Sequence, residues 1–354
     1  MTLTVSVAST ARLLSRSVRN AHAEWTTRPS CIITLESETG VRGQGEAAPL
    51  PGFSPDSLPA CQQALQAFDA SGIVARLESP QDLIAELGRA SVRIPPTLPA
   101  ARAALEGALL DLWSRAAGMP AWALLLPASS AATPRAVAAL LMTEPEQALA
   151  EALAARARGV TTFKFKIGRP GALDRELRAV QRLRAELGPL ARLRLDANQA
   201  LSVAEAQHYL PLFADSELEF IEEPCAPEGL GQLRELGELG VAYALDESLV
   251  AGALPRRGDR AVILKPTLVG GITGCVELAR AARAVDAQVI FSHAFEGALG
   301  LGLSAALALA FGSEAMAHGL DLEGARLAQL GLPGYSEANI HAWPEPGFGL
   351  AEQR

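Results

Sequence analysis

Short apolar runs that alternate with longer amphipathic stretches, from about residue 135 onward, constrain the fold of this chain more than any other feature. In stretches such as 173–188 and 274–287, apolar residues recur every three or four positions, as helices require. The strand-like runs are AVAALLM (136–142), TTFKFKI (161–167), RLRLDAN (192–198), LEFIEEP (218–224), AYALDES (242–248), AVILKP (261–266), QVIFSHA (288–294) and a weaker eighth, MAHGLDL (316–322). Seven or eight such βα units predict a parallel (β/α)8-type barrel. An open doubly wound sheet is the competing fold, but no GxGxxG follows the first strand.

The first 100 residues have a different pattern. Alternating stretches such as TLTVSVAS and SCIITLESETGVRGQGEAAPL predict an antiparallel meander, and helical patterns follow around 57–70 and 80–90. We therefore expect an α+β domain over residues 1–100 and a barrel domain over residues 101–324. The Gly- and Pro-rich tail, 325–354, has no βα pattern, and we expect it to return to the N-terminal layer.

Composition excludes several classes of function. The net charge of −8 and the pI of about 5.3 argue against nucleic acid as a partner. The four cysteines are far apart and form no zinc or disulfide framework. The sequence shows neither a signal-peptide pattern nor an apolar stretch long enough for a membrane span. We expect a soluble cytoplasmic protein, and the sequence leaves its oligomeric state open.

Charged residues occur at the ends of five predicted strands, where a buried strand should be apolar. Side chains alternate between the two faces of a strand, so the face opposite the apolar residues should line the mouth of the barrel. This parity demotes Glu223 and Glu247, and it places Arg194 and Asn198 on the face of Asp196. The residues that it selects are Lys164, Lys166, Asp196, Glu222, Asp246 and Lys265.

Asp196, Glu222 and Asp246 fall at equivalent positions on three consecutive strands, 26 and 24 residues apart. Three carboxylates in a small mouth of low dielectric need a counter-charge. A set of oxygen ligands suits a hard cation, Mg2+ or Mn2+, better than zinc. Three solvated loop carboxylates are the alternative interpretation.

The lysines flank these carboxylates along the chain, so a closed barrel would place Lys164 and Lys166 on one wall and Lys265 on the opposite wall. Repulsion between neighbouring lysines and a nearby cation would lower a lysine pKa towards neutrality and make the amine a usable base. For Lys164, a structural salt bridge is an equal alternative. A metal and a lysine base together suggest abstraction of a proton α to a carboxylate.

The segments FKFKIG, LRLDANQAL, FIEEPC, LDESL and VILKPTLVGG resemble the enolase superfamily, in its muconate-lactonizing enzyme subgroup. That subgroup has KxK on the second strand, then D, E and D as metal ligands, then K on the sixth strand. The match keeps this order over most of the chain. It implies a (β/α)7β modified TIM barrel with an α+β capping domain built from the N-terminal region and the C-terminal tail.

A narrower resemblance, to the o-succinylbenzoate synthase branch, is carried by GEAAPLPGFSPDSL (45–58), KPTLVGG and FSHAFEGALGL (291–301). It implies a lyase of menaquinone biosynthesis with a small carboxylate substrate, which undergoes Mg2+-dependent syn-dehydration. It further implies that Lys166 removes the α-proton and protonates the departing hydroxyl, that Lys265 stabilises the enediolate, and that Lys164 tunes Lys166. The implied Mg2+ ligands are Asp196, Glu222 and Asp246.

Candidate substrate contacts are less specific. The loop 49–54 and the segment 15–25 resemble the two capping-domain loops that close over substrate in this family. Arg16, Arg19 and Arg28 could bind a carboxylate, although single surface arginines are more often solvated. The candidate substrate residues are Pro51, Phe53, Ser54, Arg194, Asn198, Ser292 and His293.

Other functions stay open at this point. Many relatives have paired serines where this chain has Ser292 and His293; a histidine there is typical of the mandelate-racemase branch, but Lys265 replaces that branch's sixth-strand Asp. An N-succinylamino acid racemase or dipeptide epimerase would use the same metal and both lysines. A Schiff-base aldolase using Lys166 or Lys265, and a non-enzymatic carboxylate- or metal-binding barrel, are the remaining alternatives.

Overall fold

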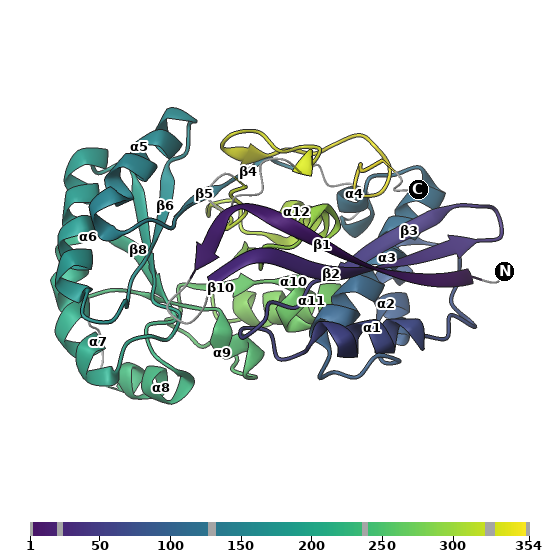
Figure 1. Cartoon of the computed structure of the whole chain (residues 1–354), viewed down its shortest axis with the longest axis horizontal. Helices are drawn as coiled ribbons and strands as arrows, with labels where there is room; N and C mark the ends of the chain where they lie inside the picture. The colour runs from purple at the N-terminus through teal and green to yellow at the C-terminus, as the bar shows by residue number, and fades with distance from the viewer. Residues whose placement is uncertain (1–2, 20–23, 127–131, 236–239, 323–329, 352–354) are drawn as a thin grey trace.

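The computed structural model describes residues 3–19, 24–126, 132–235, 240–322 and 330–351. Figure 1 shows an N-terminal layer of three strands and its helices beside a barrel of parallel strands with helices outside. A long hairpin of the N-terminal layer runs across towards the barrel (Figure 1). The predicted fold, a modified TIM barrel with an α+β capping domain, is confirmed.

The capping sheet is antiparallel and consists of β1 (Leu3–Arg19), β2 (Glu24–Ser37) and β3 (Arg42–Ala47). Half-buried positions alternate with buried ones along β3, as expected when one face of a sheet packs against a core. The packed face meets the long helix α3 (Pro99–Ala117). Gly43 and Gly45 make this contact close, because a Cβ at Gly45 would lie 1.9 Å from the carbonyl oxygen of Ala104.

Helix α3 is buried on nearly all sides, and its apolar residues occupy every face. It lies between the capping sheet and the barrel helices, which explains why it lacks a polar stripe. Among the described helices, none is both long and apolar enough to cross a lipid bilayer. The other helices before the barrel are α1 (Leu58–Gln66), η1 (Pro80–Asp82), α2 (Leu83–Ser91) and α4 (Ala121–Leu125).

In the part of the chain that the structure describes, seven parallel strands form the barrel sheet in sequence order. They are β5 (Ala138–Leu141), β6 (Thr162–Lys166), β7 (Arg192–Asp196), β8 (Leu218–Glu222), β9 (Tyr243–Leu245), β10 (Ala261–Leu264) and β11 (Gln288–Phe291). The helices between and after them are η2 (Pro145–Gln147), α5 (Ala148–Ala157), α6 (Leu173–Leu187), α7 (Val203–Tyr209), η3 (Leu210–Ser216), α8 (Pro227–Glu235), α9 (Glu247–Val250), α10 (Pro266–Val269), α11 (Gly271–Arg283) and α12 (Ala298–Phe311).

The weak eighth run, 316–322, closes the ring through isolated bridges. His318 bridges Val137 beside β5, and Gly319 bridges Ser292 beyond β11, both in the parallel sense. The segment therefore lies between the first and last strands, where an eighth strand belongs, but it forms no continuous ladder.

The described part of the C-terminal tail packs back on the connecting helices. Its strand β12 (Asn339–Ile340) pairs with β4 (Arg135–Ala136) just before the barrel. Asp111 of α3 accepts hydrogen bonds from the backbone amides of Phe348 and Gln44, so one buried carboxylate joins the tail to the capping sheet. The expected domain bounds stay a prediction.

Two glycine substitutions should have opposite effects on stability, because only one of the two glycines lies where β3 packs closely on α3. Gly45→Ala should destabilise the protein by about 1–3 kcal/mol, because the added methyl group meets backbone that cannot move aside. Gly88→Ala lies within α2, where no atom comes within 4 Å of the added methyl group, and it should stabilise by about 0.5–1 kcal/mol. Thermal unfolding of both variants measures this, and an unchanged Tm for Gly45→Ala would contradict the packing.

Candidate active site

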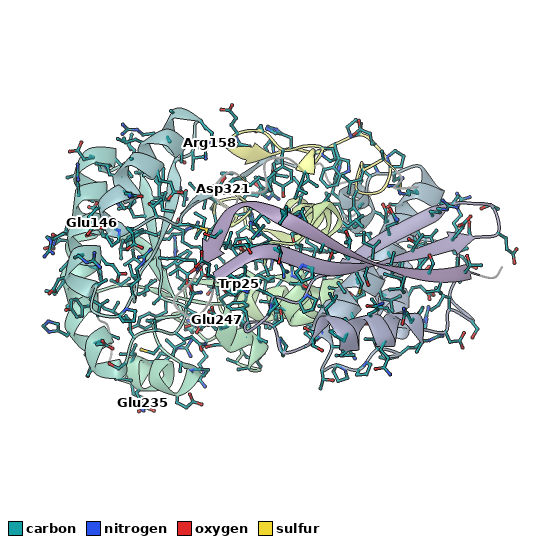
Figure 2. All side chains as sticks on the ribbon, in the orientation of Figure 1. Trp25, Glu146, Arg158, Glu235, Glu247 and Asp321 are labelled. Atoms are coloured by element: carbon teal, nitrogen blue, oxygen red, sulfur yellow. The ribbon has the colours of Figure 1, made fainter. Side chains whose placement is uncertain are left out.

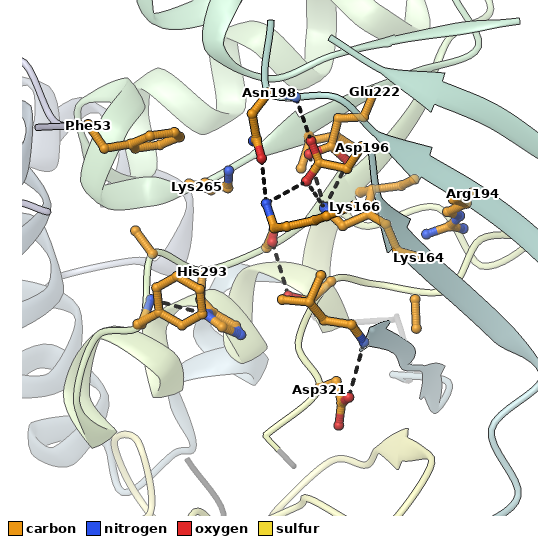
Figure 3. A pocket seen from close by; sticks show the side chains of 18 of the residues that line it. Phe53, Lys164, Lys166, Arg194, Asp196, Asn198, Glu222, Lys265, His293 and Asp321 are labelled. Atoms are coloured by element: carbon orange, nitrogen blue, oxygen red, sulfur yellow. Dashed lines mark hydrogen bonds and ion pairs between the residues drawn. The ribbon is translucent and has the colours of Figure 1, made fainter. Parts of the chain in front are cut away.

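A cavity opens at the C-terminal ends of the barrel strands and brings together residues from both parts of the molecule (Figure 3). The capping region contributes Trp25, Leu50 and Phe53. The strand ends contribute charged groups, as expected at the C-terminal face of a barrel, where active sites lie. These charged groups are Lys164, Lys166, Arg194, Asp196, Glu222, Lys265 and Asp321.

The whole chain contains three lysines, and all three line this cavity. The remaining residues among the 31 lysines and arginines are arginine. An arginine side chain stays protonated in proteins, whereas a lysine amine can lose its proton. Lysine is thus confined to the site where a proton can be exchanged, a signal that a simple count of lysines in the sequence would have found.

Lys164 and Lys166 project from the same face of β6, as strand parity predicted. The Nζ atom of Lys164 lies 3.0 and 2.9 Å from the two carboxylate oxygens of Glu222 and 3.3 Å from Asp196 Oδ2. Lys166 Nζ donates to Asp196 Oδ2 at 3.1 Å and to Asn198 Oδ1 at 2.6 Å (Figure 3). Asp196 therefore lies between the two amines.

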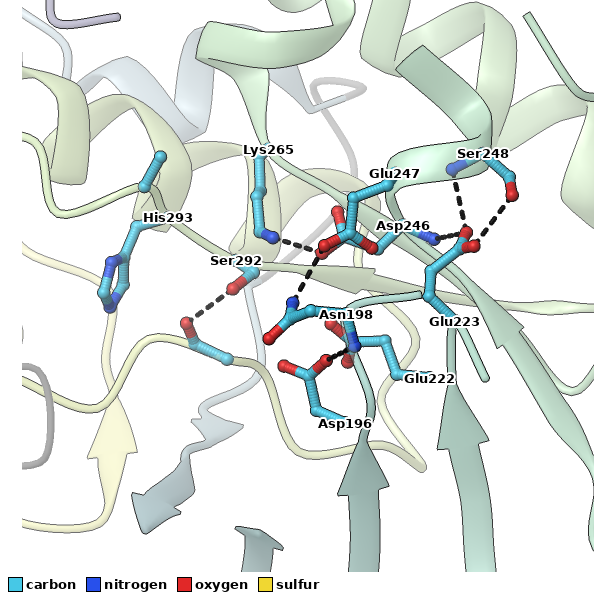
Figure 4. Close-up of polar contacts among 12 residues, drawn as sticks. Asp196, Asn198, Glu222, Glu223, Asp246, Glu247, Ser248, Lys265, Ser292 and His293 are labelled. Atoms are coloured by element: carbon cyan, nitrogen blue, oxygen red, sulfur yellow. Dashed lines mark hydrogen bonds and ion pairs between the residues drawn. The ribbon is translucent and has the colours of Figure 1, made fainter. Parts of the chain in front are cut away.

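Lys265 follows β10 and approaches the carboxylates from another part of the barrel wall. Its Nζ atom donates a hydrogen bond to Asp246 Oδ2 (Figure 4). The same Nζ lies 5.1 Å from the centroid of the Phe53 ring, a cation–π distance. The capping loop thus contacts one of the three lysines directly.

The charges of the protein raise the pKa of Lys164 and of Lys265, whereas the sequence led us to expect a lowered lysine pKa. Burial acts to lower the pKa of Lys164, but Glu222 and Asp196 outweigh it and raise the value. At Lys265, burial likewise acts to lower the pKa, but the charges of Asp246 and Glu247 outweigh it and raise the value. With these charges alone both amines are protonated, because each lies among more carboxylates than ammonium groups.

The carboxylates divide into two groups. Burial acts to raise the pKa of Asp196, but Lys166 and Lys164 dominate and lower it. At Glu222, burial and the neighbouring Asp196 raise the pKa to about 7, despite Lys164. At Asp246, burial raises the pKa to about 6, although Lys265 works against it. The cluster as a whole therefore lacks positive charge.

Parity was right for Glu223 and failed for Glu247. Glu223 points away from the cluster and accepts hydrogen bonds from the amides of Asp246 and Ser248 and from the Ser248 hydroxyl (Figure 4). Glu247 accepts from Asn198 Nδ2 at 2.8 Å, and the charges of Lys265 and Asp196 act on it. The reason is that β9 ends at Leu245 and α9 begins at Glu247, so the two-residue period no longer applies.

Five of the seven candidate substrate residues line the cavity: Phe53, Arg194, Asn198, Ser292 and His293. The other two, Pro51 and Ser54, are not among the lining residues and instead stabilise their own loop. The Ser54 hydroxyl accepts from the amide of Leu50 at 2.7 Å, and the Pro51 carbonyl accepts from the Trp25 indole at 3.1 Å. These two hydrogen bonds fix the conformation of the loop 49–54.

His293 is held as a neutral imidazole. Its Nδ1 atom accepts a hydrogen bond from the backbone amide of Phe295 at 3.1 Å. Burial, followed by the charges of Lys265 and Lys164, lowers its pKa to about 3. An imidazole in this state is not paired through Nδ1 with a carboxylate, which is consistent with the expectation that it lines the pocket.

Arg28 has a structural role rather than the suggested carboxylate-binding one. It is buried, and its guanidinium donates to the carbonyl oxygens of Ala48, Pro49 and Phe295. The side chain therefore ties the capping loop to the loop after β11. The side chains of Arg16 and Arg19 lie outside the described residues.

Trp25 lines the cavity at the end of the segment 15–25, as expected of a capping loop, whereas Phe295 and Asp321 are lining residues that were not among the candidates. Asp321 lies in the last βα segment, and its Oδ2 accepts from the amide of Leu140 (Figure 3). Its position just after the run MAHGL is the strand-end signal used for the other carboxylates. Trp25 and Asp321 come from opposite ends of the chain, and only the folded protein brings them to one cavity (Figure 2).

Comparisons with known proteins agree with this geometry. The family profile described as "Enolase C-terminal domain-like" matches residues 147–352, and that of the "Mandelate racemase / muconate lactonizing enzyme, N-terminal domain" matches residues 2–125. The chain belongs to the enolase superfamily. Its capping region and barrel correspond to the two parts that these profiles describe.

Similar proteins of this superfamily include enzymes of two activities. The o-succinylbenzoate synthase of Thermosynechococcus vestitus is 31% identical over 300 residues, 81% of this chain and 82% of the relative. That of Klebsiella pneumoniae is 31% identical over 327 residues, 90% and 88% of the two chains. A dipeptide epimerase from Methylococcus capsulatus, solved with Mg and the dipeptide L-Arg-D-Lys, superposes with a TM-score of 0.85 at 25% identity and covers 99% of this chain and 100% of its own.

The contacts of Arg28 predict a variant that loses stability and not substrate affinity alone. Arg28→Met should destabilise the protein by about 2 kcal/mol or more, because three carbonyls in a buried region lose a charged donor. Arg42→Met, which removes an exposed ion pair with Glu36, is the control and should change stability by less than about 1 kcal/mol. A raised KM with unchanged Tm for Arg28→Met would instead favour a substrate-binding role.

Proposed function

We propose that the chain is an o-succinylbenzoate synthase, which dehydrates 2-succinyl-6-hydroxy-2,4-cyclohexadiene-1-carboxylate to o-succinylbenzoate in menaquinone biosynthesis. The observation that carries the proposal is the contact of three cavity-lining lysines with Asp196, Glu222 and Asp246. Asp196 and Glu222 line the cavity themselves, and Asp246 lies behind Lys265, whose amine it binds. The similarity to two o-succinylbenzoate synthases, over 81% and 90% of this chain, supports the choice of reaction.

The chemistry of the donors fits Mg2+. Asp196, Glu222 and Asp246 would hold the ion, since they supply the oxygen ligands that Mg2+ prefers. As they stand, no three acidic, histidine or cysteine side chains of the described residues are poised to hold an ion, because the lysines engage the carboxylates. One carboxylate oxygen beside the cluster, Glu247 Oε2, is buried without a hydrogen-bond partner among the described residues. When bound, Mg2+ would supply positive charge for the substrate carboxylate as electron density moves onto it.

In the proposed reaction Lys166 carries out both proton transfers, and Lys265 stabilises the charge that develops between them. Lys166, in its neutral form, removes the proton from C1 of the substrate, and the electron pair of that C–H bond moves towards the carboxylate. The Lys265 ammonium stabilises the negative charge that develops there. The pair then returns to form the ring double bond as the C6–O bond breaks, and the proton held by Lys166 passes to the leaving hydroxyl to give water. Lys164 tunes Lys166 through its charge and its shared partner Asp196.

The remaining walls suit a six-membered ring with a second carboxylate. Apolar walls come from Ile263, Ile290 and Leu140, and the aromatic ring of Phe53 covers them from the capping loop. Arg194 is buried, and its Nη2 has no hydrogen-bond partner among the described residues. Since a guanidinium binds carboxylates well, Arg194 is our candidate for the succinyl carboxylate.

The ultraviolet progress curve of the cyclohexadiene substrate, recorded with Mg2+ and with EDTA, tests the proposal. We expect conversion to o-succinylbenzoate with Mg2+, and loss of that conversion in EDTA that added Mg2+ restores. No conversion by protein that binds Mg2+ would overturn the proposal.

One observation favours a second function, dipeptide epimerisation. Asp321 places a buried carboxylate in the cavity wall, and its negative charge would favour the ammonium group of a dipeptide over an anionic group. The structural similarity to the dipeptide epimerase agrees with this alternative. Exchange of a dipeptide α-proton with solvent deuterium, without any dehydration of the cyclohexadiene acid, would establish it.

The proposed base predicts a variant with lost activity and kept fold. Lys166→Ala should lower kcat by about 100-fold or more, as expected when a general base is removed. Its Tm should stay within a few degrees of the unaltered protein, since the buried Asp196 keeps the ammonium of Lys164 at 3.3 Å. Arg192→Ala, at the opposite end of β7, is the control and should keep kcat. Near-normal turnover by Lys166→Ala would show that another group is the base.

A further inference from the structure

We propose that Arg169 is a positioning residue for Lys166, acting through the backbone at the end of β6. Its Nη1 donates to the carbonyl oxygen of Lys166 at 2.8 Å, and its Nη2 donates to the carbonyl oxygen of Thr143 at 2.9 Å. The guanidinium therefore joins the chain just beyond β5 to the last residue of β6. This inference rests on the proposed role of Lys166 as the base.

The pairing of β5 with β6 ends before the carbonyl group of Lys166. The pairing of β5 with β6 runs from Ala138 opposite Thr162 to Leu141 opposite Phe165, so Lys166 lies beyond the last pair. Past that point the chain after β5 turns away, and the amides of Met142 and Thr143 donate to the carboxylate of Glu151. The Thr143 amide, which would meet the Lys166 carbonyl if the ladder continued, is thus engaged elsewhere, and that carbonyl needs another donor.

The guanidinium of Arg169 supplies that donor. Its planar fork of donors can meet two carbonyl oxygens at once, which a single ammonium on a flexible stem does less well. The group also lies 5.6 Å from the centroid of the Phe165 ring, whose backbone belongs to the last β5–β6 pair. Arg169 thus contacts both the end of the ladder and the residue just beyond it.

A buried glutamate holds Arg169 in turn. Glu176, in the first turn of α6, accepts from Arg169 Nη1 at 3.1 Å and from the amides of Gly168 and Arg169 at 2.7 and 3.2 Å. Gly168 has a φ of +88°, and a Cβ there would lie 2.7 Å from the Ala200 methyl group. The turn after Lys166 is therefore closely packed, and the arginine is fixed at both ends.

On the other side of β6, the amide of Ile167 donates to the carbonyl of Asp196 at 2.9 Å. The backbone around Lys166 is thus held by β7 on one side and by Arg169 on the other. The Lys166 amine needs this support because it must keep its contacts with Asp196 and Asn198 in register with the substrate. A misplacement of a catalytic group by about 1 Å can reduce turnover about 100-fold.

The chain contains a matched control. The Arg169 side chain is 20% exposed and pairs with the fully buried Glu176. The Arg234 side chain is 21% exposed and pairs with the buried Asp259, in the loop before β10 and hence away from the catalytic strand ends. Arg169→Met and Arg234→Met therefore remove equivalent ion pairs, of which only the first contacts the backbone of Lys166.

The first measurement is steady-state turnover of the cyclohexadiene acid by both variants. We expect Arg169→Met to lower kcat about 10- to 100-fold with KM changed by less than about threefold, and Arg234→Met to keep both. Arg169→Lys should also lose kcat, because it keeps the charge and loses the bridge. Equal losses in the two methionine variants would assign Arg169 a general stabilising role and overturn the proposal.

The second measurement does not depend on the substrate. Because the chain has three lysines, lysine labelled with 13C at Cε gives NMR signals from Lys164, Lys166 and Lys265 alone. These are assigned with Lys164→Arg and Lys265→Arg. Arg169→Met should shift or broaden the Lys166 signal and leave that of Lys265 in place, whereas Arg234→Met should move neither. An unmoved Lys166 signal would overturn the positioning role, whether or not the proposed reaction is found.

Discussion

The buried contacts between three lysines and the carboxylates at the barrel mouth are the interaction on which the site depends. Removing an ionised carboxylate from water costs several kcal/mol even after the protein relaxes, and a close ammonium offsets this only with good geometry. Asp196, Glu222 and Asp246 are almost fully buried, and each has a lysine amine at contact distance. The arrangement to which we assign proton transfer is therefore also the one that lets these acids be buried. With Glu247, on which the charge of Lys265 acts, the cluster holds four acids against three amines, a charge balance suited to a bound cation.

A second set of carboxylates accepts hydrogen bonds from backbone amides. In this way it supports the loops around the lysine–carboxylate cluster. Glutamates accept backbone amides in the turns that follow catalytic or neighbouring strands; among them are Glu46, Glu106, Glu151, Glu176 and Glu223. Two of these, Glu46 and Glu106, precede the barrel in the chain. Glu46 of β3 accepts from the amides at the start of α12, and Glu106 of α3 accepts from the amide and hydroxyl of Thr273 in α11. The capping sheet and its connecting helix therefore support the barrel loops as well as covering the cavity, so substrate enclosure and loop geometry are parts of one packed structure.

Much of the site could be predicted from the sequence, because residues on one strand obey a local rule. The two-residue period correctly put Lys164 and Lys166 on one face and turned Glu223 away from the cluster. It failed at Glu247, where the strand has ended and a helix begins. Arg28 was also beyond prediction: its three acceptors are carbonyl groups of two distant loops, and backbone acceptors leave no signature in the sequence. The weak eighth run was placed correctly along the chain, but its isolated bridges depend on how the first and last strands meet.

The sequence by itself determined the order of the strands and helices, and which face of each strand carries charge. Both follow from periodicity, which is a property of neighbouring residues. Only the tertiary structure decided which lysine meets which carboxylate, and that Trp25 and Asp321 share a cavity. These contacts join residues that are tens to hundreds of positions apart. They form only when the barrel closes in one register and the capping hairpin packs across its mouth, because no local rule relates side chains whose strands are brought together by the core.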